Sequence, residues 1–144
     1  MEQLSEIEQV LVQKSKDVMK NAYCAYSKFP VGAAILAEDG SVILGANHEN
    51  ASYGGTICAE RSAMCAALTA GHRKFKSIAI CTELPDPASP CGLCRQFLIE
   101  FGNYKVILCS STSDKLMVTS TKELLPHAFT PASLDEFENM KANK

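Results

Sequence analysis

Residues 77–81 read Ser-Ile-Ala-Ile-Cys, and this almost wholly apolar run decides the fold class. A strand that is apolar at successive positions is typical of a sheet buried on both faces. Residues 38–40, Glu-Asp-Gly, predict a tight hairpin turn between two further strands. The predicted strands are, in chain order, residues 31–37, 41–46, 77–81, 105–109 and 116–119.

Helices are predicted before, between and after these strands. Ser5 opens a capping box for the first helix, and Ser89 followed by Pro90 predicts the start of the third. The predicted helical segments are residues 5–22, 59–70, 90–101 and 122–125, with a last helix that Ser133 caps. This order of elements predicts an α/β fold, a three-layer α/β/α arrangement around one mixed five-stranded sheet.

Length and composition place these elements in a single domain, residues 1–144. The chain is 47% hydrophobic and 21% charged, which is ordinary for a globular protein, and its formal net charge is −2. That charge disfavours a nucleic acid polymer, which clustered Lys and Arg would bind. No apolar run approaches the roughly 20 residues of a membrane span. Small-molecule partners are therefore expected, with no nucleic acid polymer and no membrane.

The seven cysteines are an odd number, and the chain opens without a basic and apolar leader. Thiols in such a chain are typical of a reducing cytosol, so a cytoplasmic protein is expected, with cysteines used for metal binding or packing. Four of the cysteines lie in apolar surroundings and are predicted to be buried structural thiols, namely Cys24, Cys65, Cys81 and Cys109.

The other three cysteines accompany a glutamate in two short motifs, Cys58-x-Glu60 and Pro90-Cys91-x-x-Cys94. Three thiolates can hold one zinc ion and leave a fourth position open for water, beside a carboxylate that moves protons. Successive residues on a helix are turned by about 100°, so Cys58 and Glu60 can approach one ion only at the start of a helix. Two helix N-termini directed at one zinc per chain are therefore predicted.

Zinc held by three thiolates carries a net negative charge, which helix N-termini and a nearby cation would offset. Arg61 is the predicted cation, as a hydrogen-bond donor to a thiolate, and Arg95 is a second candidate. A solvated surface position is the alternative for both.

A structural zinc knot and a redox Cys-x-x-Cys pair are the alternatives for the metal motif. A structural knot usually needs a fourth protein ligand, which His48 or Cys65 would have to supply. Cys65 lies about 10 Å farther along its helix than Cys58, which is too far for one ion. A catalytic zinc is therefore the preferred interpretation, and a hydrolase is expected.

At these motifs the chain resembles the zinc-dependent nucleoside and nucleobase deaminases, most closely the small homotetrameric type of cytidine deaminase. The likeness also covers residues 23–34, 47–53 and 123–126. Cysteine at position 58, where many deaminases of single strands and nucleotides have histidine, favours the branch that acts on free nucleosides. The mechanism below is the one known for that class.

The resemblance implies that Cys58, Cys91 and Cys94 bind zinc and that Glu60 takes a proton from the zinc-bound water. The hydroxide then attacks C4 of cytosine, and Glu60 passes protons to N3 and to the leaving amine. The expected reaction converts free cytidine and 2′-deoxycytidine to uridine and 2′-deoxyuridine with release of ammonia, as in pyrimidine salvage.

The resemblance also implies a set of substrate contacts. Asn47 and Glu49, two residues apart at the end of a strand, suit the hydroxyls of a ribose. Phe29 would lie against the pyrimidine ring. The backbone N–H of Ala59 and the carbonyl of Ser89 would read the O2 and the amino group of the base.

The last implied feature is a homotetramer with active sites at subunit interfaces. Phe129 matches a residue that this family inserts into a neighbouring subunit's site, and Tyr53 matches a position near the ribose at the interface. At position 130 this chain has threonine, where members of the resembled family often have glycine.

Two other functions stay open from the sequence, namely a deaminase of a modified cytosine nucleoside and a non-enzymatic zinc module or thiol redox protein. Asn47 and Glu49 favour a bare ribose over a modified one. A role in editing polynucleotides is disfavoured by the acidic charge balance.

Overall fold

The computed structural model describes residues 3–143 and is built on a mixed five-stranded sheet. The strand order is β2-β1-β3-β4-β5, with β3 and β4 parallel and every other neighbouring pair antiparallel. The strands are β1 (Val31–Ala37), β2 (Val42–Ala46), β3 (Phe75–Thr82), β4 (Lys105–Ser110) and β5 (Leu116–Ser120). All five predicted strands are present, and β3 has the apolar 77–81 run at the middle of the sheet.

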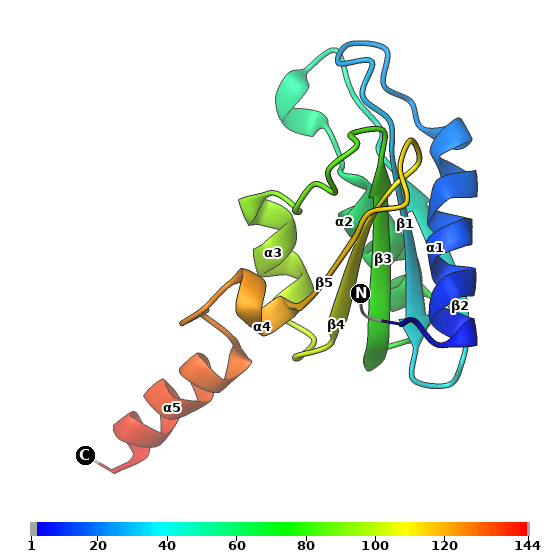
Figure 1. The fold of residues 1–144 in the computed structure, drawn as a ribbon. Helices are drawn as coiled ribbons and strands as arrows, with labels where there is room; N and C mark the ends of the chain where they lie inside the picture. Colours follow the sequence, from blue (N-terminus) through cyan, green and yellow to red (C-terminus); the bar gives the residue numbers. More distant parts are fainter. Residues whose placement is uncertain (1–2, 144) are drawn as a thin grey trace.

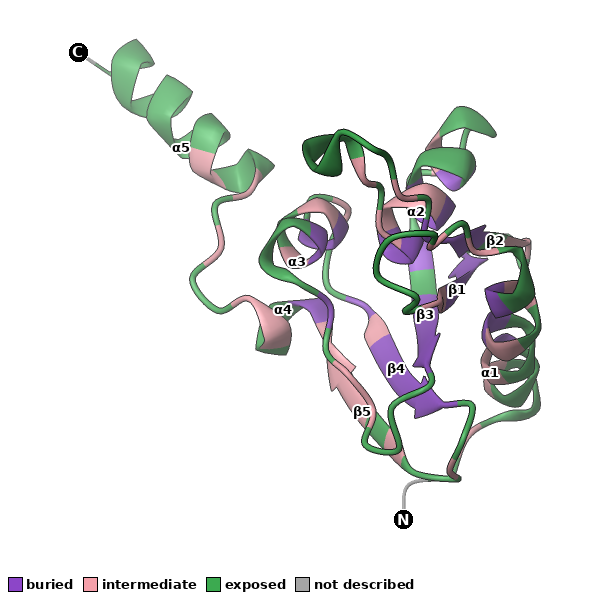
Figure 2. Ribbon diagram, turned by 90° about the horizontal axis from the view of Figure 1, so that it is seen from above, coloured by how far each residue is buried: buried purple, intermediate pink, exposed green. Residues whose placement is uncertain are grey.

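Helices cover both faces of this sheet, as Figure 1 shows. Helix α1 (Glu6–Val18), extended by a 3-10 turn over Met19–Asn21, covers one face, and α2 (Ala59–Thr69) and α3 (Gly92–Ile99) cover the other. Alternate residues of the strands face the two layers, so that Ala79 packs with α1 and Ile80 packs with α2. The three-layer α/β/α architecture is therefore confirmed. The buried residues in Figure 2 lie mainly along β1, β3 and β4 and on the helix faces turned toward them.

Two predicted helix starts are wrong. Helix α3 begins at Gly92 with Cys91 as its N-cap, and Ser89 and Pro90 lie in the preceding loop. The backbone of Cys91 is extended and its carbonyl accepts the first helical hydrogen bond, from the N–H of Arg95 at 2.9 Å.

Helix α5 (Pro131–Ala142) begins earlier than predicted, because Thr130 rather than Ser133 is its N-cap. The Ser133 hydroxyl oxygen accepts a hydrogen bond of 3.3 Å from the N–H of Thr130, and Pro131 occupies the first helical position, where its missing N–H is tolerated. A short helix, α4 (Thr121–Leu124), precedes it. Helix α5 extends away from the sheet in Figure 1 and covers neither face.

The prediction of four buried cysteines is half wrong. Cys81 and Cys109 are buried between the sheet and α1, but Cys65 is exposed and Cys24 is half-buried. Cys65 lies on the face of α2 that is turned away from the buried positions Ala63, Met64 and Ala67, so its apolar neighbours in sequence do not surround it. None of the described helices has the length and apolar content needed to cross a membrane.

Helix α2 lies directly against β2 at Gly45. A Cβ atom at Gly45 would be 2.4 Å from the backbone nitrogen of Ala63 and 2.6 Å from the carbonyl oxygen of Ala59. Both of those atoms belong to the helix backbone, which cannot rotate aside. The absence of a side chain at Gly45 therefore sets the distance between the sheet and the helix that begins with Ala59 and Glu60.

The Gly45→Ala variant is expected to unfold at a melting temperature roughly 10 °C lower, a loss of about 3 kcal/mol, because the helix must move off the sheet. Calorimetry or circular dichroism measures the shift. Gly54→Ala is the control, since nothing lies within 4 Å of its added Cβ. A Gly45→Ala protein as stable as the control would show that α2 does not depend on this close approach.

Candidate active site

Three cysteine sulfurs meet at the starts of two helices. Cys58 is the N-cap of α2, Cys91 is the N-cap of α3, and Cys94 lies in the first turn of α3. The Sγ atoms of Cys58 and Cys91 are 3.9 Å apart, and those of Cys91 and Cys94 are 3.6 Å apart. All seven cysteines are free thiols. Among the described residues, this is the one group of three or more possible metal ligands, and its ligand atoms lie within 4.8 Å of one another.

The sulfur triangle fits a zinc ion. Tetrahedral zinc with Zn–S bonds of about 2.3 Å requires sulfurs about 3.8 Å apart, which agrees with the spacing found here. Neither His48 nor Cys65 belongs to the group, so the part of the chain that the structure describes supplies three ligands and no fourth. A site with three protein ligands leaves one position for a water molecule or substrate, which is the arrangement of a catalytic zinc site.

The surroundings of the sulfurs favour negative charge. Both helices direct their N-terminal ends at the cluster, where the helix dipole is positive. The Arg61 Nη2 atom lies 3.7 Å from Cys58 Sγ and 3.3 Å from the carbonyl oxygen of Thr56. Its Nε atom is the one buried side-chain nitrogen or oxygen without a hydrogen-bond partner among the described residues. A cation with a spare donor is therefore placed beside the thiolates.

The pKa values of the thiols follow from these contacts. The Cys94 thiol donates to Cys58, and this hydrogen bond, together with Arg61, lowers the pKa of Cys58 to about 5. The pKa of Cys94 is raised, because its proton is the one shared with Cys58 and because the thiol is buried. A thiolate is the form that binds metal, so Cys58 is ready to bind zinc at neutral pH.

Arg95, the second candidate thiolate partner, binds elsewhere. Its Nε donates to the carbonyl of Pro90 at 2.8 Å, and its Nη1 donates to the carbonyl of Leu124 at 2.9 Å. Arg95 thus joins the loop before Cys91 to the end of α4, and the expectation of a sulfur contact is not met.

Glu60 is the second residue of α2 and is only 5% exposed. Burial raises the pKa of its carboxyl group, and the nearby Cys58 thiolate adds to the effect. A raised pKa makes the carboxylate a better proton acceptor, which suits a role in general acid–base catalysis.

A cavity of about 280 Å³ opens beside Glu60. Five separate segments between residues 27 and 89 form its wall, and six of its lining residues are predicted substrate or catalytic residues. Those six are Phe29, Asn47, Glu49, Ala59, Glu60 and Ser89, and the wall also includes the ligand Cys58. The structure thus brings the metal cluster, the buried carboxyl group and most of the predicted substrate contacts to one place.

Two of the predicted substrate-binding residues lie outside this cavity. Tyr53 lines an adjoining cavity of about 270 Å³ with Tyr26, Ser27, Glu49 and Thr56, and the two cavities share the last three. Phe129 is 62% exposed, and its backbone oxygen accepts a hydrogen bond of 2.8 Å from the side chain of Gln96 on α3.

Six residues that line the cavity beside Glu60 are not predicted from the sequence, namely Ser27, Val31, Thr56, Ile80, Thr82 and Ala88. The alternation of β3 could have found Thr82, since residues 80 and 82 of a strand point to the same face. Ser27 and Thr56 lie in irregular segments, where no periodicity marks the inward side.

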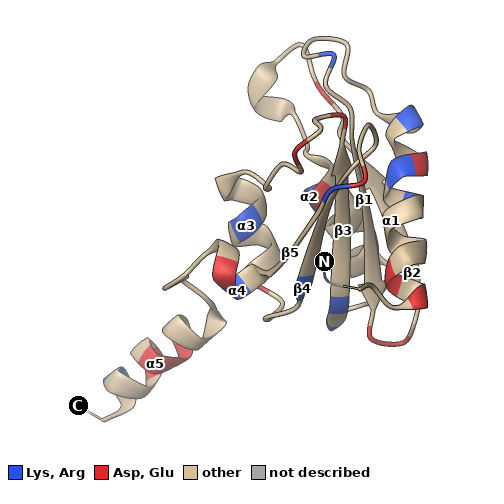
Figure 3. Cartoon of the chain, viewed as in Figure 1, with Lys and Arg blue, Asp and Glu red and all other residues tan. Residues whose placement is uncertain are grey.

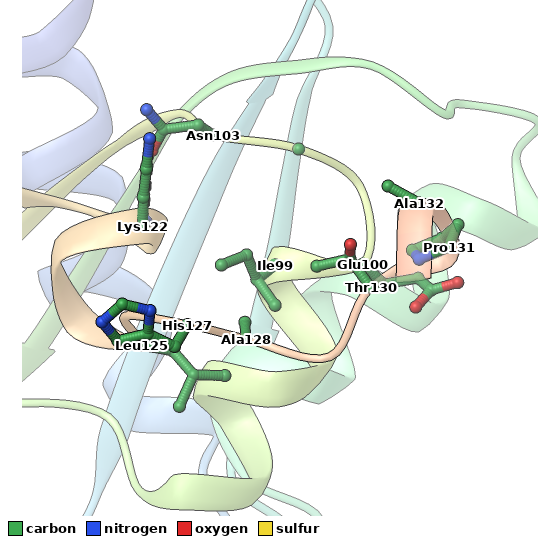
Figure 4. A pocket seen from close by; sticks show the side chains of 11 residues that line it. Ile99, Glu100, Asn103, Lys122, Leu125, His127, Ala128, Thr130, Pro131 and Ala132 are labelled. Carbon is green, nitrogen blue, oxygen red and sulfur yellow. Dashed lines mark hydrogen bonds between the residues drawn. The ribbon is translucent and has the colours of Figure 1, made fainter. Parts of the chain in front are cut away.

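The cavity beside Glu60 is not the largest one in the described part of the chain. A larger cavity, of about 550 Å³, lies between the end of α3, α4 and the start of α5 (Figure 4). Its ionisable residues, Glu100, Lys122 and His127, come from three different segments. The cavity at Glu60 is smaller but adjoins the metal cluster, so the chemistry is placed there.

Comparison with known proteins agrees with this geometry. Residues 5–110 match the cytidine and deoxycytidylate deaminase zinc-binding region. The chain belongs to this deaminase family. A cytidine deaminase of Sporosarcina psychrophila is 45% identical over 126 residues, which cover 86% of this chain and 92% of that protein. One from Halalkalibacterium halodurans is 44% identical over 89% of this chain and 98% of that protein.

The fold of the family is equally clear in a solved structure. The crystal structure of cytidine deaminase from Burkholderia pseudomallei superimposes with a TM-score of 0.82 at 44% identity, covering 88% of this chain and 100% of that one. The mixed sheet and the positions of its helices are therefore those of the deaminase family.

Removal of one sulfur ligand is expected to release the metal. Cys91→Ala should weaken zinc binding by more than about 100-fold, since two thiolates cannot hold the ion against a chelator. Metal analysis after dialysis against a competing chelator measures it. Cys65→Ala is the matched control, because its thiol is exposed and outside the cluster, and it should keep one zinc per chain. Full zinc retention by Cys91→Ala would contradict the ligand assignment.

Proposed function

We propose that this chain is a single catalytic domain, residues 1–144, that hydrolyses free cytidine and 2′-deoxycytidine to uridine and 2′-deoxyuridine with release of ammonia. One observation carries the proposal, namely that the buried Glu60 shares a cavity wall with Cys58, one of three cysteines whose sulfurs cluster at two helix N-termini. The membership of the chain in the deaminase family, and its relatives named cytidine deaminase, support it.

In this proposal Cys58, Cys91 and Cys94 hold one zinc ion. When bound, zinc supplies the Lewis acidity that makes a water molecule nucleophilic near neutral pH. Glu60 accepts a proton from the attacking water and delivers it to N3 of the base as the C4–O bond forms. It then accepts the second proton from the new C4 hydroxyl and delivers it to the amine, which leaves as the C4–N bond breaks. Water and cytidine are consumed, and uridine and ammonia are formed, so Glu60 ends as it began. Arg61 offsets the negative charge of the sulfur cluster.

The remaining cavity residues are proposed to orient the nucleoside. Phe29 lies against the pyrimidine ring, the Ala59 N–H and the Ser89 carbonyl contact the base, and Asn47 and Glu49 bind the ribose hydroxyls. No lysine or arginine belongs to the described lining of this cavity, and Glu49 adds a carboxylate at the ribose end. A 5′-phosphate would be repelled there, which favours free nucleosides over nucleotides.

Glu60→Gln tests the proton transfer. The variant should bind zinc as the wild type does and lose at least about a thousandfold in kcat for cytidine, because the amide cannot shuttle a proton. The fall in cytidine absorbance measures turnover, and metal analysis measures the zinc. Glu6→Gln, an exposed glutamate on α1, is the control and should be unaffected. Turnover near the wild-type rate in Glu60→Gln would remove Glu60 from the mechanism.

A modified cytosine nucleoside is the other candidate substrate. Competition between cytidine and a nucleoside that carries a bulky group on its sugar decides between them on the purified protein. The polar wall at Asn47 and Glu49 favours the unmodified ribose.

A cytoplasmic homotetramer with active sites at its subunit interfaces, acting in pyrimidine salvage, completes the proposal. Tyr53 and Phe129 are 72% and 62% exposed, as aromatic residues that contact a neighbouring subunit would be in a single chain. Helix α5 has a stripe of exposed apolar residues at helical spacing, namely Leu134, Phe137 and Met140. A stripe of this kind is typical of a helix that packs against a partner.

Light scattering tests the assembly. The wild-type protein should have four times the 15.6 kDa mass of one chain. Replacing Leu134 and Phe137 together by Glu should yield smaller species, because charges would enter an apolar contact. Glu136→Gln on the same helix is the control and should keep the wild-type mass. A monomeric wild type would contradict the tetramer.

A further inference from the structure

The loop before β1, which carries Phe29, contains a residue with an unusual backbone conformation. Lys28 has a φ of 60°, in the left-handed region that non-glycine residues seldom adopt. The turn is closed by a hydrogen bond of 2.9 Å from the N–H of Lys28 to the carbonyl of Cys24. A turn of this kind needs support from neighbouring groups if Phe29 is to keep one position.

Ser27 provides that support from one side. Its hydroxyl donates to the Oε2 atom of Glu49 and accepts a hydrogen bond of 3.0 Å from the N–H of Phe29. The Oε1 atom of the same carboxylate accepts the N–H groups of Tyr26 and Ser27 at 3.0 and 2.9 Å. One hydroxyl group thus connects the carboxylate to the backbone that bears the aromatic ring.

Asn47 holds Phe29 from the other side. Its Nδ2 donates to the carbonyl of Phe29, and its Oδ1 accepts the N–H of Val31, both at 2.9 Å. The N–H and the carbonyl of Phe29 are therefore both fixed by side chains. Each atom of the Asn47 amide keeps one further hydrogen-bonding capacity, so this role is compatible with ribose binding.

We propose that Ser27 is a positioning residue of the nucleoside site, whose hydroxyl sets the Phe29 ring and the Glu49 carboxylate at a fixed distance for the base and the ribose. The proposal rests on the proposed function. Ser27 lines both the cavity beside Glu60 and the adjoining cavity that contains Tyr53. Its hydroxyl therefore lies between the residues proposed to contact the base and those proposed to contact the ribose.

The charge of Glu49 depends on the same hydroxyl. The pKa of Glu49 is lowered, and the hydrogen bond from the Ser27 side chain is the largest cause, followed by the backbone N–H of Ser27. The backbone N–H of Tyr26 and the charge of Lys28 lower it further and would remain without the Ser27 hydroxyl. An ionised carboxylate is an acceptor for ribose hydroxyls, whereas a protonated one is a poorer acceptor. Loss of the Ser27 hydroxyl should raise the pKa of Glu49, so that substrate binding weakens at a higher pH than in the wild type.

Steady-state kinetics of Ser27→Ala with cytidine tests the proposal. KM should rise about tenfold while kcat changes less than about threefold, because a binding contact is loosened and the proton transfer is not. Ser27→Thr keeps the hydroxyl and should restore most of the KM. Ser5→Ala is the matched control, since Ser5 caps α1 on the opposite side of the sheet from the cavity. It should lose stability without a change in KM.

Two further measurements separate positioning from a general loss of structure. As the pH is lowered, the KM of Ser27→Ala should begin to rise at a higher pH than that of the wild type. Amide hydrogen exchange at Phe29, which needs no turnover, should be faster in Ser27→Ala and normal in Ser27→Thr. An unchanged KM, an effect on kcat alone, or normal exchange at Phe29 in Ser27→Ala would overturn the proposal.

The same kinetic measurements distinguish a failure of the proposed function from a failure of the role proposed for Ser27. A wild-type protein with bound zinc that does not convert cytidine would overturn the proposed function and, with it, the role of Ser27 in binding. An active wild type with a kinetically normal Ser27→Ala variant would overturn only the assignment of Ser27.

Discussion

The arrangement of this protein depends on three sulfurs that must lie within bonding distance of one ion. Cys58 comes from one helix, and Cys91 and Cys94 from another, so the two helices must begin at the same point in space. The close approach of α2 to the sheet at Gly45 fixes one helix, and the parallel pairing of β3 and β4, with α3 between them in sequence, fixes the other. The buried Glu60, in the first turn of α2, lines the cavity beside the cluster.

The substrate side of the cavity is organised by side chains that bind backbone. Asn47 and Glu49 do not simply project into empty space, because each already holds part of the loop around Phe29. Such residues serve binding in two ways, by offering polar atoms and by fixing where an aromatic ring lies. This explains why a short exposed loop with a left-handed residue can form one wall of a binding site.

Most of the fold and the metal cluster could be predicted from the sequence because both depend on local patterns. Apolar runs mark the strands, and Cys58, Cys91 and Cys94 occur at spacings that suit the first turn of a helix. What could not be predicted depends on partners distant in sequence. Ser27 contacts a carboxylate 22 residues away, and the spacing between them carries no periodic signal. The start of α3 is a further example, since the Ser89-Pro90 pair is a good local start, yet the extended backbone continues through Cys91 and the helix begins at Gly92.

The contacts of Arg95 have a mechanical consequence. Its guanidinium group donates hydrogen bonds to the carbonyl of Pro90, which precedes the ligand Cys91, and to the carbonyl of Leu124, at the end of α4. A planar guanidinium bonded at two of its nitrogens limits how far these two parts of the chain can move relative to one another. The segment that leads to α5 is therefore tied, through one side chain, to the residue next to the ligand Cys91.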